Sequence, residues 1–408
     1  MMDKKTASYN FPQTNMSSTT IETATAPAAA AAATEPQQPE DLSQYDFSRL
    51  PKYVHPPETQ ASLPWSELVT LDLSDFSQPG GKARLASQLS HAVHHVGFFY
   101  VKNFGLSQEE IDRQFTLAQN FFALPVSEKE KYEVDYAAAD YNGWRRPGQR
   151  WDTAVKDNIE IYNIPKFTSD FAGKYAQPPL LQAHMPEIEH FAKTLHSNII
   201  LPLLRLFAIV LQLPDEEYLV RQHTYEPKSE DHFRYMVYHP RSAEEHEKSE
   251  YGQTTGHTDL GTVTLLFRQP VAGLQILGED GNWSWVKAEE GTVTVNLADT
   301  ISHLTGGWLK SSVHRVVAPP KDQWSYNRTG VLYFARPHND TILRPILDSP
   351  VLQAAGVEPV FERDVTMEEW VRAKQRLQLN PEIARKKWEE RGDGTVEVLS
   401  GWRDRRYK

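Results

Sequence analysis

The sequence has 408 residues, a formal net charge of -11 and no cysteine. The acidic balance disfavours a nucleic-acid partner, because phosphate binding needs clustered lysine and arginine. The lack of cysteine excludes disulfides, thiolate metal sites and a cysteine nucleophile. No apolar run reaches the ~18 residues of a membrane span, so we expect no membrane partner.

Residues 1–60 are predicted to be a disordered, low-complexity tail followed by a surface lead-in. Residues 1–40 are rich in Ser, Thr, Ala, Pro and Gln, with an alanine run at Ala28–Ala33. Such a segment buries too little apolar surface to offset the entropy of ordering it. It lacks the features of a signal or transit peptide, so a cytoplasmic location is the default expectation.

Residues 61–230 are predicted to hold alternating strands and helices. Residues 69–73 alternate as a strand, and residues 82–96 have the apolar spacing of a helix that leads into the buried strand GFFYVKNFG. Ser107 and Glu110 then form a capping box for a second helix.

A long helical periodicity follows at Pro178–Leu213, where Pro186 and Pro202 should break or kink the helix. Its apolar stripe is predicted to pack in the core.

His91, His94 and His95 cluster on the first of these helices. A spacing of i, i+4 could bind a metal, but no carboxylate accompanies them. Exposed or half-buried helix positions are therefore the favoured interpretation.

From Phe233 onward the pattern changes to short strands separated by Gly, Asp, Asn or Pro turns: FRYMVYH, VTLLF, LQIL, SWVK, TVTVN, VHRVV and TGVLYFA. Many short strands predict a mainly β fold with flanking helices, arranged as a sandwich or barrel. The charged loop Arg241–Gly252 is either a lid or a solvated loop. Residues 377–408 are predicted to form a charged helical tail.

The residues that point to chemistry are His257, Asp259 and His314. In an extended segment residues i and i+2 face the same side, so His257 and Asp259 can reach one point. His314, in the β-branched stretch SSVHRVV, is the natural third ligand. Two histidines and one carboxylate leave three coordination positions open, as in non-haem Fe(II) oxygenases.

The surroundings of these residues resemble the 2-oxoglutarate- and Fe(II)-dependent oxygenases, in particular the isopenicillin N synthase-like branch. The resemblance is carried, in order, by the H-x-D pair and by the segments Gly273–Ile276, Trp283–Val286, Asn296–Asp299, His314–Val316 and Arg328. It extends from about residue 60 to about residue 376. It implies one oxygenase domain at 61–376, with a double-stranded β-helix (jelly roll) core at 231–340.

The resemblance also implies the cofactors: Fe(II), 2-oxoglutarate as co-substrate and O2, with ascorbate as a further candidate. Arg328 matches the arginine of the family's R-x-S motif, which binds the far carboxylate of 2-oxoglutarate. Gly330 replaces the motif's serine, and Thr329 should point to the opposite face. Tyr238 resembles a tyrosine that could donate to the same carboxylate, although His239 replaces a proline beside it.

The substrate side of the predicted site is less specific. Tyr141, Trp144 and Arg145 lie in a loop that borders the substrate in the family, with a surface turn around an aromatic plug as the alternative. Phe334 should share a face with Arg328, where it either lines the substrate or packs in the core. Asn296 and Asp299 are expected to be structural hydrogen-bonding residues at a strand end and a turn.

The implied function is an oxygenase that hydroxylates, desaturates or cyclises a small molecule, such as a specialised metabolite, with release of succinate and CO2. A monomer or homodimer is expected. The alternatives are an Fe(II) oxidase of the same fold that does not use 2-oxoglutarate, a ligand-binding relative without turnover, and a zinc hydrolase. The last needs a general base, and none is evident near the motif.

Overall fold

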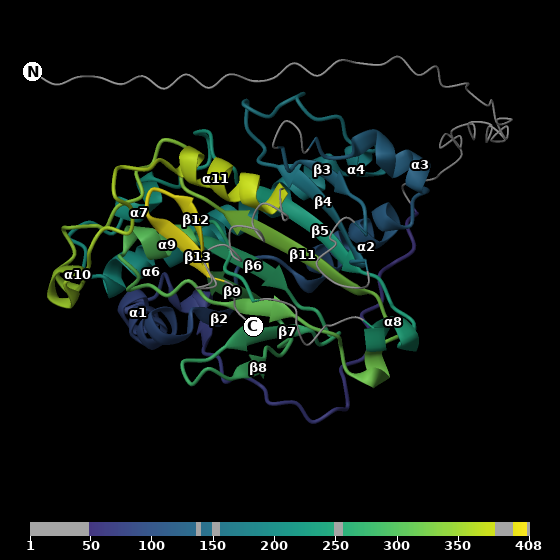
Figure 1. Ribbon diagram of the computed structural model, residues 1–408, viewed down its shortest axis with the longest axis horizontal. Coiled ribbons are helices and arrows are strands. Elements are labelled where there is room, and N and C mark those ends of the chain that lie inside the picture. The colour runs from purple at the N-terminus through teal and green to yellow at the C-terminus, as the bar shows by residue number, and fades with distance from the viewer. Residues whose placement is uncertain (1–48, 136–139, 149–155, 249–255, 380–394, 406–408) are drawn as a thin grey trace, which may run out of the picture. The chain divides into compact units, whose positions relative to one another are not determined.

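The computed structural model describes residues 49–135, 140–148, 156–248, 256–379 and 395–405. These residues form a large mixed sheet and a three-stranded sheet (Figure 1). The large sheet has the order β1-β2-β9-β6-β11-β5-β4-β3, and the small sheet has the order β10-β7-β8. The strands are β1 (Thr70–Asp72), β2 (Phe98–Lys102), β3 (Gly143–Arg145), β4 (Ile159–Pro165), β5 (His232–Tyr238), β6 (Val263–Phe267), β7 (Leu274–Leu277), β8 (Trp283–Trp285), β9 (Thr292–Leu297), β10 (His314–Val316) and β11 (Arg328–Ala335).

The two sheets enclose an apolar layer. Side chains from β2 meet side chains from the small sheet and the residue after it, and the buried members are Phe98, Tyr100, Leu274, Ile276 and Val286. Burial of such side chains is the main favourable term that holds two sheets together. This arrangement confirms the predicted jelly-roll core.

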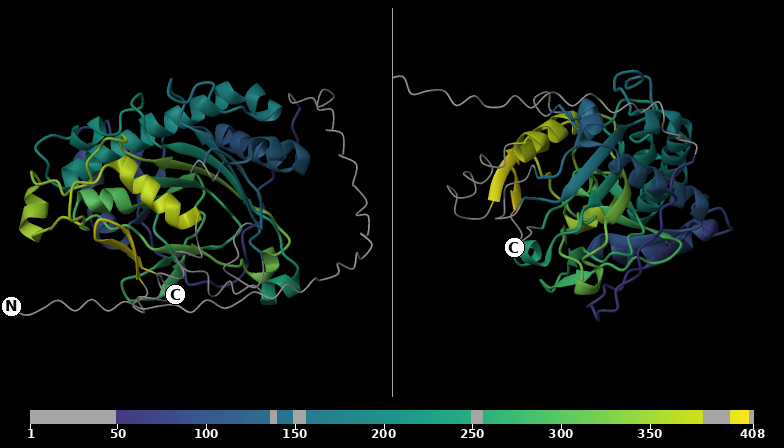
Figure 2. Two further views of the ribbon diagram at one scale, coloured as in Figure 1. Left: turned by 45° about the horizontal axis from the view of Figure 1, so that its top comes forward. Right: turned by 90° about the vertical axis from the view of Figure 1, so that its right-hand side faces the viewer.

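Helices flank the large sheet, and Figure 2 shows the longest of them lying along one of its faces. They are α1 (Gly81–His91), α2 (Gln108–Phe122), α3 (Val126–Lys129), α4 (Pro179–Ala183), α5 (Met185–Leu195), α6 (Leu201–Val210), α7 (Tyr218–Arg221), α8 (Ala243–Lys248), α9 (Asp299–Leu304), α10 (Pro350–Ala355) and α11 (Met367–Leu379). The capping box predicted at Ser107 and Glu110 starts α2.

The periodicity predicted at Pro178–Leu213 becomes three helices, α4, α5 and α6, and a π-helical turn at His196–Ile200 joins the last two. Pro186 and Pro202 lie in the first turns of α5 and α6, where a missing N–H costs little. By length and composition alone, Met185–Val210 could cross a membrane, but half of its apolar window is buried in the protein. Its stripe packs in the core, as predicted.

Strand register decides which side chains face the metal motif. β11 pairs with β5 and β6, so Arg328 lies opposite Tyr238 and Phe334 lies between His232 and Thr264. Because side chains alternate along a strand, residues 328, 330, 332 and 334 share one face, and residues 329, 331 and 333 share the helix-covered face. The prediction that Thr329 faces away from Arg328 is confirmed.

The C-terminal segment corrects one prediction. Residues 395–405 are not helical but form the hairpin β12 (Thr395–Leu399) and β13 (Trp402–Arg405), next to α11 (Figure 1). Trp402 packs on His303 and Trp370, with ring centroids 4.5 and 6.3 Å away. Residues 380–394 lie outside the described residues. The charged composition hid this strand pairing, because tryptophan burial against α9 and α11 decides it.

Two further sequence features find their place. The charged loop Arg241–Gly252 begins with the short helix α8, capped by Ser242 and Glu245, and its last four residues lie outside the described ranges. His94 stacks on Trp308, with ring centroids 4.2 Å apart, which agrees with a packing role for that histidine.

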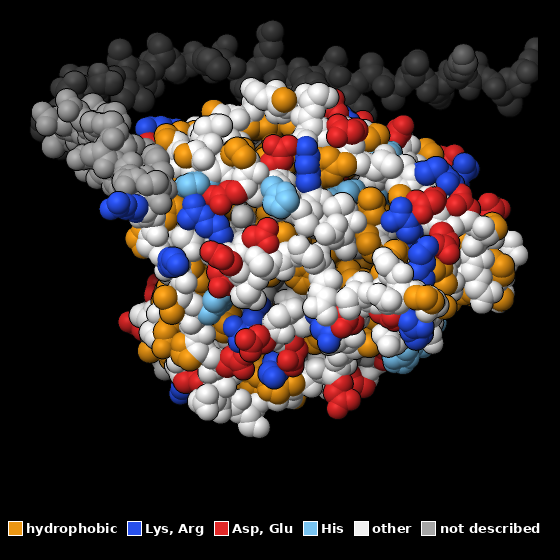
Figure 3. Space-filling view, turned by 180° about the vertical axis from the view of Figure 1, so that it is seen from behind, with side chains coloured by type: hydrophobic (Ala, Val, Ile, Leu, Met, Phe, Trp, Pro, Cys, Tyr) orange, Lys and Arg blue, Asp and Glu red, His pale blue; other side chains and the backbone are white. Residues whose placement is uncertain are grey.

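Figure 3 shows the face turned away in Figure 1, where Lys and Arg side chains are interspersed with Asp and Glu. A surface of mixed sign lacks the one-signed stripe that a phosphate backbone requires. That the protein has no nucleic-acid partner stays a prediction.

Candidate metal centre and co-substrate pocket

His257, Asp259 and His314 converge as predicted. A two-residue bridge joins His257 to His314, with each backbone N–H donating to the other's carbonyl at 2.9 Å. Asp259 Oδ1 lies 3.9 Å from His257 Nε2 and 3.7 Å from His314 Nε2. Their ligand atoms all lie within 4.8 Å of one another, and no other group of three metal-binding side chains occurs among the described residues. Two imidazoles and a carboxylate suit Fe(II).

Hydrogen bonds orient two of these ligands. His314 Nδ1 lies 3.0 Å from the carbonyl of Ser312, which leaves Nε2 to face the metal position. Asp259 Oδ2 accepts from Thr264 Oγ1 at 2.7 Å and from Asn296 Nδ2 at 2.9 Å, so Oδ1 stays available. The side chain of His257 is 57% exposed and that of His314 only 10%, so the metal position is reached from the side of His257.

The electrostatics favour an ionised ligand. Burial raises the pKa of Asp259, but the imidazoles of His314 and His257 and the hydrogen bonds from Asn296 and Thr264 outweigh burial and lower the pKa below its usual value. Asp259 is therefore a carboxylate throughout the neutral range, as a metal ligand must be.

Asn296 was expected to be only a structural hydrogen-bonding residue, but its side chain also orients the metal ligand Asp259. It is the penultimate residue of β9, at the strand end as predicted. Asp299 is structural, as expected: its backbone N–H donates to the carbonyl of Asp259, and its carboxylate accepts from Ser311 at 2.8 Å. A polar Asn in the otherwise apolar strand end TVTVNL was the available signal.

We expect Asn296→Ala to weaken metal binding by about 10–100-fold, the usual cost of losing a partner that orients a ligand. The comparison variant is Asn282→Ala, which removes an exposed turn asparagine bonded to Asp280. Titration with Mn(II), followed by electron paramagnetic resonance, measures the affinity. Equal dissociation constants for the two variants would show that Asn296 does not position Asp259.

Arg328 lies where the resemblance requires a cation. It is buried, its Nε donates to the carbonyl of Val271 at 3.1 Å, and its guanidinium carbon lies 5.4 Å from the ring centroid of Tyr238. No carboxylate pairs with it within the described parts of the chain. Burial lowers its pKa, with Tyr238 opposing, but a guanidinium remains charged at neutral pH. A buried, unpaired cation is costly unless an anionic ligand completes it.

A small cavity between the two sheets leads to this guanidinium. Leu266, Leu274 and Val286 line it together with the polar side chains of Gln269, Thr294, Lys287 and Arg328. Apolar side chains with a few polar groups, one of them a buried guanidinium, are suited to bind one end of a dicarboxylate.

The glycine that replaces the motif's serine is explained by Gln269. A Cβ on Gly330 would lie 2.2 Å from Gln269 Nε2 and 3.1 Å from Met236 Cγ. The same Nε2 donates to the carbonyl of Thr329 at 3.1 Å, while Oε1 is buried without a hydrogen-bond partner. The amide of Gln269 thus occupies the space of the missing hydroxyl, in the cavity that contains Arg328.

Restoring the serine with Gly330→Ser is therefore expected to lower the free energy of unfolding by about 1–3 kcal/mol, the usual cost of overpacking. Gln269→Ala makes room, so the double variant should be less destabilised than the sum of the two single changes. Urea denaturation of the four proteins measures the coupling. Additive effects would mean that the two side chains do not compete for this space.

The residues predicted to border the substrate do not all lie on the metal-facing side of the sheet. Phe334 is half-buried on the metal-facing side, where the guanidinium of Arg234 lies 4.4 Å from its ring. The carbonyl of Tyr141 accepts from Asn163 at 2.6 Å, and Asn163 Oδ1 accepts in turn from Arg234. Tyr141 and Phe334 are thus both connected to Arg234.

The prediction that Trp144 borders the substrate is wrong. It is 1% exposed, its indole donates to Glu160 at 2.7 Å, and Lys129 lies over its ring. It points to the helix-covered face of β3, because it pairs with Tyr162, and that position leaves no contact with a substrate. Arg145, its neighbour, faces the metal side but pairs with Asp157 at 2.6 Å. Arg150 and Trp151 lie outside the described residues.

Sequence reasoning missed Arg234, Arg336, Gln269 and Thr264. Arg234 precedes Tyr238 by an even number of residues, and Arg336 follows Phe334 in the same way. Even spacing in a strand places them on the metal-facing side. Charged residues at such positions in otherwise apolar strands were the signal.

The site and the two-sheet fold define a non-haem Fe(II) oxygenase, and comparisons with known proteins agree. The sequence profile of the 2OG-Fe(II) oxygenase superfamily matches residues 217–337. A second profile, described as 'non-haem dioxygenase in morphine synthesis N-terminal', matches residues 68–183. The chain belongs to the 2OG-Fe(II) oxygenase superfamily. It uses Fe(II), 2-oxoglutarate and O2, and it is a 2-oxoglutarate-dependent dioxygenase.

Three known proteins illustrate this relationship. The UPF0676 protein C1494.01 of Schizosaccharomyces pombe is 31% identical over 293 residues, which cover 69% of this chain and 85% of that protein. The 2-oxoglutarate-Fe(II) type oxidoreductase ppzD of Metarhizium majus is 29% identical over 322 residues, covering 71% and 90%. A full-length Neurospora crassa protein, crystallised in complex with alpha-KG, shares the fold, with a TM-score of 0.67 and 22% identity over 78% of this chain and 100% of that one.

Proposed function

We propose that this protein oxidises a C–H bond of a small-molecule substrate, as a hydroxylase, desaturase or cyclase of specialised metabolism. The observation that carries the proposal is the position of the ligand set. His257, Asp259 and His314 lie at the edge of a sheet face that is not covered by helices, and Phe334 and Arg234 on that face are only half-buried. A side chain of intermediate exposure beside a metal can contact a ligand.

Different residues of the chain bind the co-substrate, exclude water and orient the substrate. Bound Fe(II) supplies the activation of O2. Arg328 holds the far carboxylate of 2-oxoglutarate, and Tyr238 is placed to support it. Apolar side chains between the sheets, including Phe98 with its ring centroid 5.6 Å from that of His314, exclude water from one side of the metal position. Phe334 and its neighbours orient the substrate, which is the protein's main contribution to rate.

One observation favours this function over the ligand-binding alternative. A ligand-binding relative without turnover has no need of a complete ligand set. Oxidases of the same fold that do not use 2-oxoglutarate also carry an arginine at the position of Arg328, so release of labelled CO2 distinguishes them.

The experiment is a screen of small molecules with the Fe(II)-loaded protein and 2-oxoglutarate labelled at C1. We expect labelled CO2 and succinate to be released in a substrate-dependent way, with an oxidised product of the substrate in equal amount. Oxidised product without labelled CO2 would identify the oxidase alternative, and binding without product would identify the non-catalytic one.

A further inference from the structure

A second pair of arginines lies on the metal-facing side of the large sheet. Arg234 is in β5, and Arg336 directly follows β11. Arg336 Cγ lies 3.1 Å from where a Cβ on Gly261 would be, two residues after the ligand Asp259. The guanidinium of Arg234 lies 4.4 Å from the ring of Phe334, which is opposite Thr264, the residue that donates to Asp259.

Neither arginine is paired with an acid within the described parts of the chain. Arg234 Nε donates to Asn163 Oδ1 at 2.7 Å, and its guanidinium lies 3.3 Å from His232 Nε2 and over the Phe334 ring. Arg336 is 6% exposed, and its Nε is buried without a hydrogen-bond partner. A buried and a half-buried cation near each other are costly, because each loses water and repels the other.

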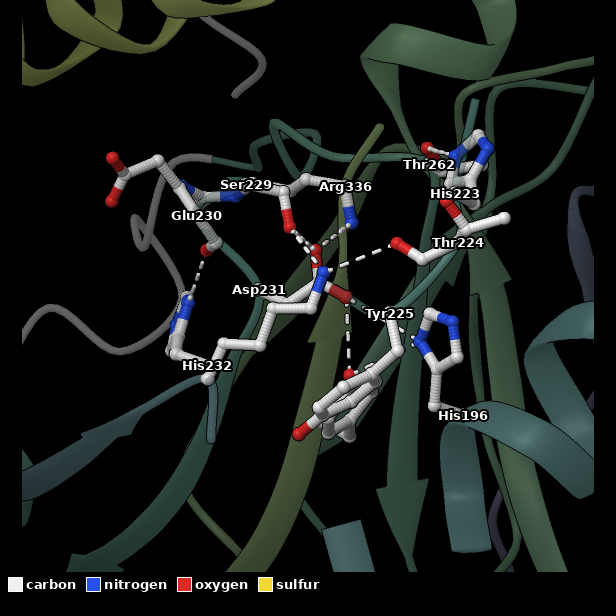
Figure 4. A network of polar contacts seen from close by, with 12 residues as sticks. His196, His223, Thr224, Tyr225, Ser229, Glu230, Asp231, His232, Thr262 and Arg336 are labelled. Atoms are coloured by element: carbon white, nitrogen blue, oxygen red, sulfur yellow. Dashed lines mark hydrogen bonds and ion pairs between the residues drawn. The ribbon is translucent and has the colours of Figure 1, made fainter. Parts of the chain in front are cut away.

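The carboxylate of the neighbouring Asp231 forms its hydrogen bonds with groups other than the two guanidinium groups. Asp231 accepts the backbone N–H of Arg336 at 3.0 Å, and its carboxylate turns toward the helix-covered face (Figure 4). There it accepts from Ser229 at 2.9 Å and from Tyr333 at 3.1 Å, and His196 lies 3.6 Å away. Asp231 is thus satisfied without the guanidinium of Arg336.

His232, which lies between the two arginines, does not offset their charge. Its ring stacks on Phe334, with centroids 4.6 Å apart. Burial first, and then the charges of Arg336 and Arg234, lower its pKa well below the usual value, so it is neutral. Arg234 and Arg336 therefore carry two positive charges that form no ion pair with a described acid.

We propose that Arg234 and Arg336 bind a carboxylate of the substrate, so that this enzyme acts on small organic acids. The forked guanidinium is the group best suited to hold a carboxylate with two parallel hydrogen bonds. This inference rests on the proposed function. It is distinct from the co-substrate site, since Arg328 and Arg336 are eight residues apart along an extended segment, ~26 Å at about 3.3 Å per residue.

The first test uses the ligand-free protein. A buried guanidinium without a bound anion destabilises the folded protein. Arg336→Met should therefore raise the melting temperature by about 2–4 °C. The matched control is Arg145→Met, which removes an arginine already paired with Asp157 and should lower it. If Arg336→Met lowers the melting temperature as Arg145→Met does, Arg336 is structural and the proposal is wrong.

The second test measures binding without turnover. The protein is loaded with Mn(II) and 2-oxoglutarate and titrated with matched pairs of acids and amides: phenylacetate with phenylacetamide, and octanoate with octanamide. We expect at least one acid to bind and its amide not to, with at least ~10-fold weaker binding in Arg234→Met and Arg336→Met. Arg336→Lys, which keeps the charge, should retain part of the affinity.

Four outcomes of this titration would overturn the proposal. No acid binds, an amide binds as well as its acid, the arginine variants bind the acid unchanged, or inorganic phosphate, used as a third probe, binds more tightly than every acid. Affinity for 2-oxoglutarate should fall in Arg328→Met and not in the other two variants. Acid binding through these arginines without succinate formation by the Fe(II) protein would contradict the proposed function and leave the anion site standing.

Discussion

Asp259→Ala is expected to reduce succinate formation from 2-oxoglutarate by more than about 100-fold. The side chain supplies the only carboxylate of the ligand set, and loss of even an outer partner of a ligand costs roughly 10–100-fold. Its Oδ1 lies within 4 Å of both imidazole ligands, so no other described acid can take its place. Metal content after dialysis and succinate release by mass spectrometry measure the two losses separately.

The control for this variant is Asp322→Ala, which removes an exposed aspartate bonded to Thr59 and Gln60 on the surface. It should keep its metal and its activity. Metal retention and near-normal succinate formation by Asp259→Ala would show that the chain binds iron elsewhere, and the assigned centre would be wrong.

Arg328→Met is expected to raise the KM for 2-oxoglutarate by at least about 30-fold. Loss of one partner from a buried charge pair typically costs about 2–5 kcal/mol, and about 2 kcal/mol corresponds to about 30-fold. The effect should be large because the guanidinium is buried, lines the cavity between the sheets and has no carboxylate partner among the described residues.

Arg268→Met is the matched control, because Arg268 pairs with Glu58 at 2.6 Å near the surface. Its KM for 2-oxoglutarate should stay within about twofold of that of the unmodified protein. Steady-state rates at saturating metal and substrate give both values. An unchanged KM for Arg328→Met would mean that another cation binds the co-substrate, and the assignment of Arg328 would be wrong.

Much of this site was predictable because its ligands lie in or beside extended segments: His314 is in β10, His257 is bridged to it, and Asp259 follows two residues later. Alternation in an extended chain places His257 beside Asp259 and Phe334 on the face of Arg328, whatever the rest of the fold does. The β-branched stretch around His314 and the short strands of the core likewise follow from local pattern, and the described strands begin and end close to their predicted positions. The chemistry that these residue types imply, Fe(II) with open positions, needs no coordinates.

Other features depend on neighbours that are distant in the chain. The burial of Trp144 follows from the pairing of β3 with β4, and the C-terminal hairpin follows from the packing of Trp402 on α11. Neither contact leaves a periodic signal, because each joins segments whose separation is set by the fold.

The sequence alone therefore determined the metal ligands and the class of reaction, since strand geometry and residue chemistry are local. Only the tertiary structure decided which polar groups are paired. It showed that Asn296 holds Asp259, that Gln269 fills the space beside Gly330, and that Arg234 and Arg336 lie together without an acid among the described residues. Charge pairing depends on distances across the sheet, and those distances exist only once the strands are in register.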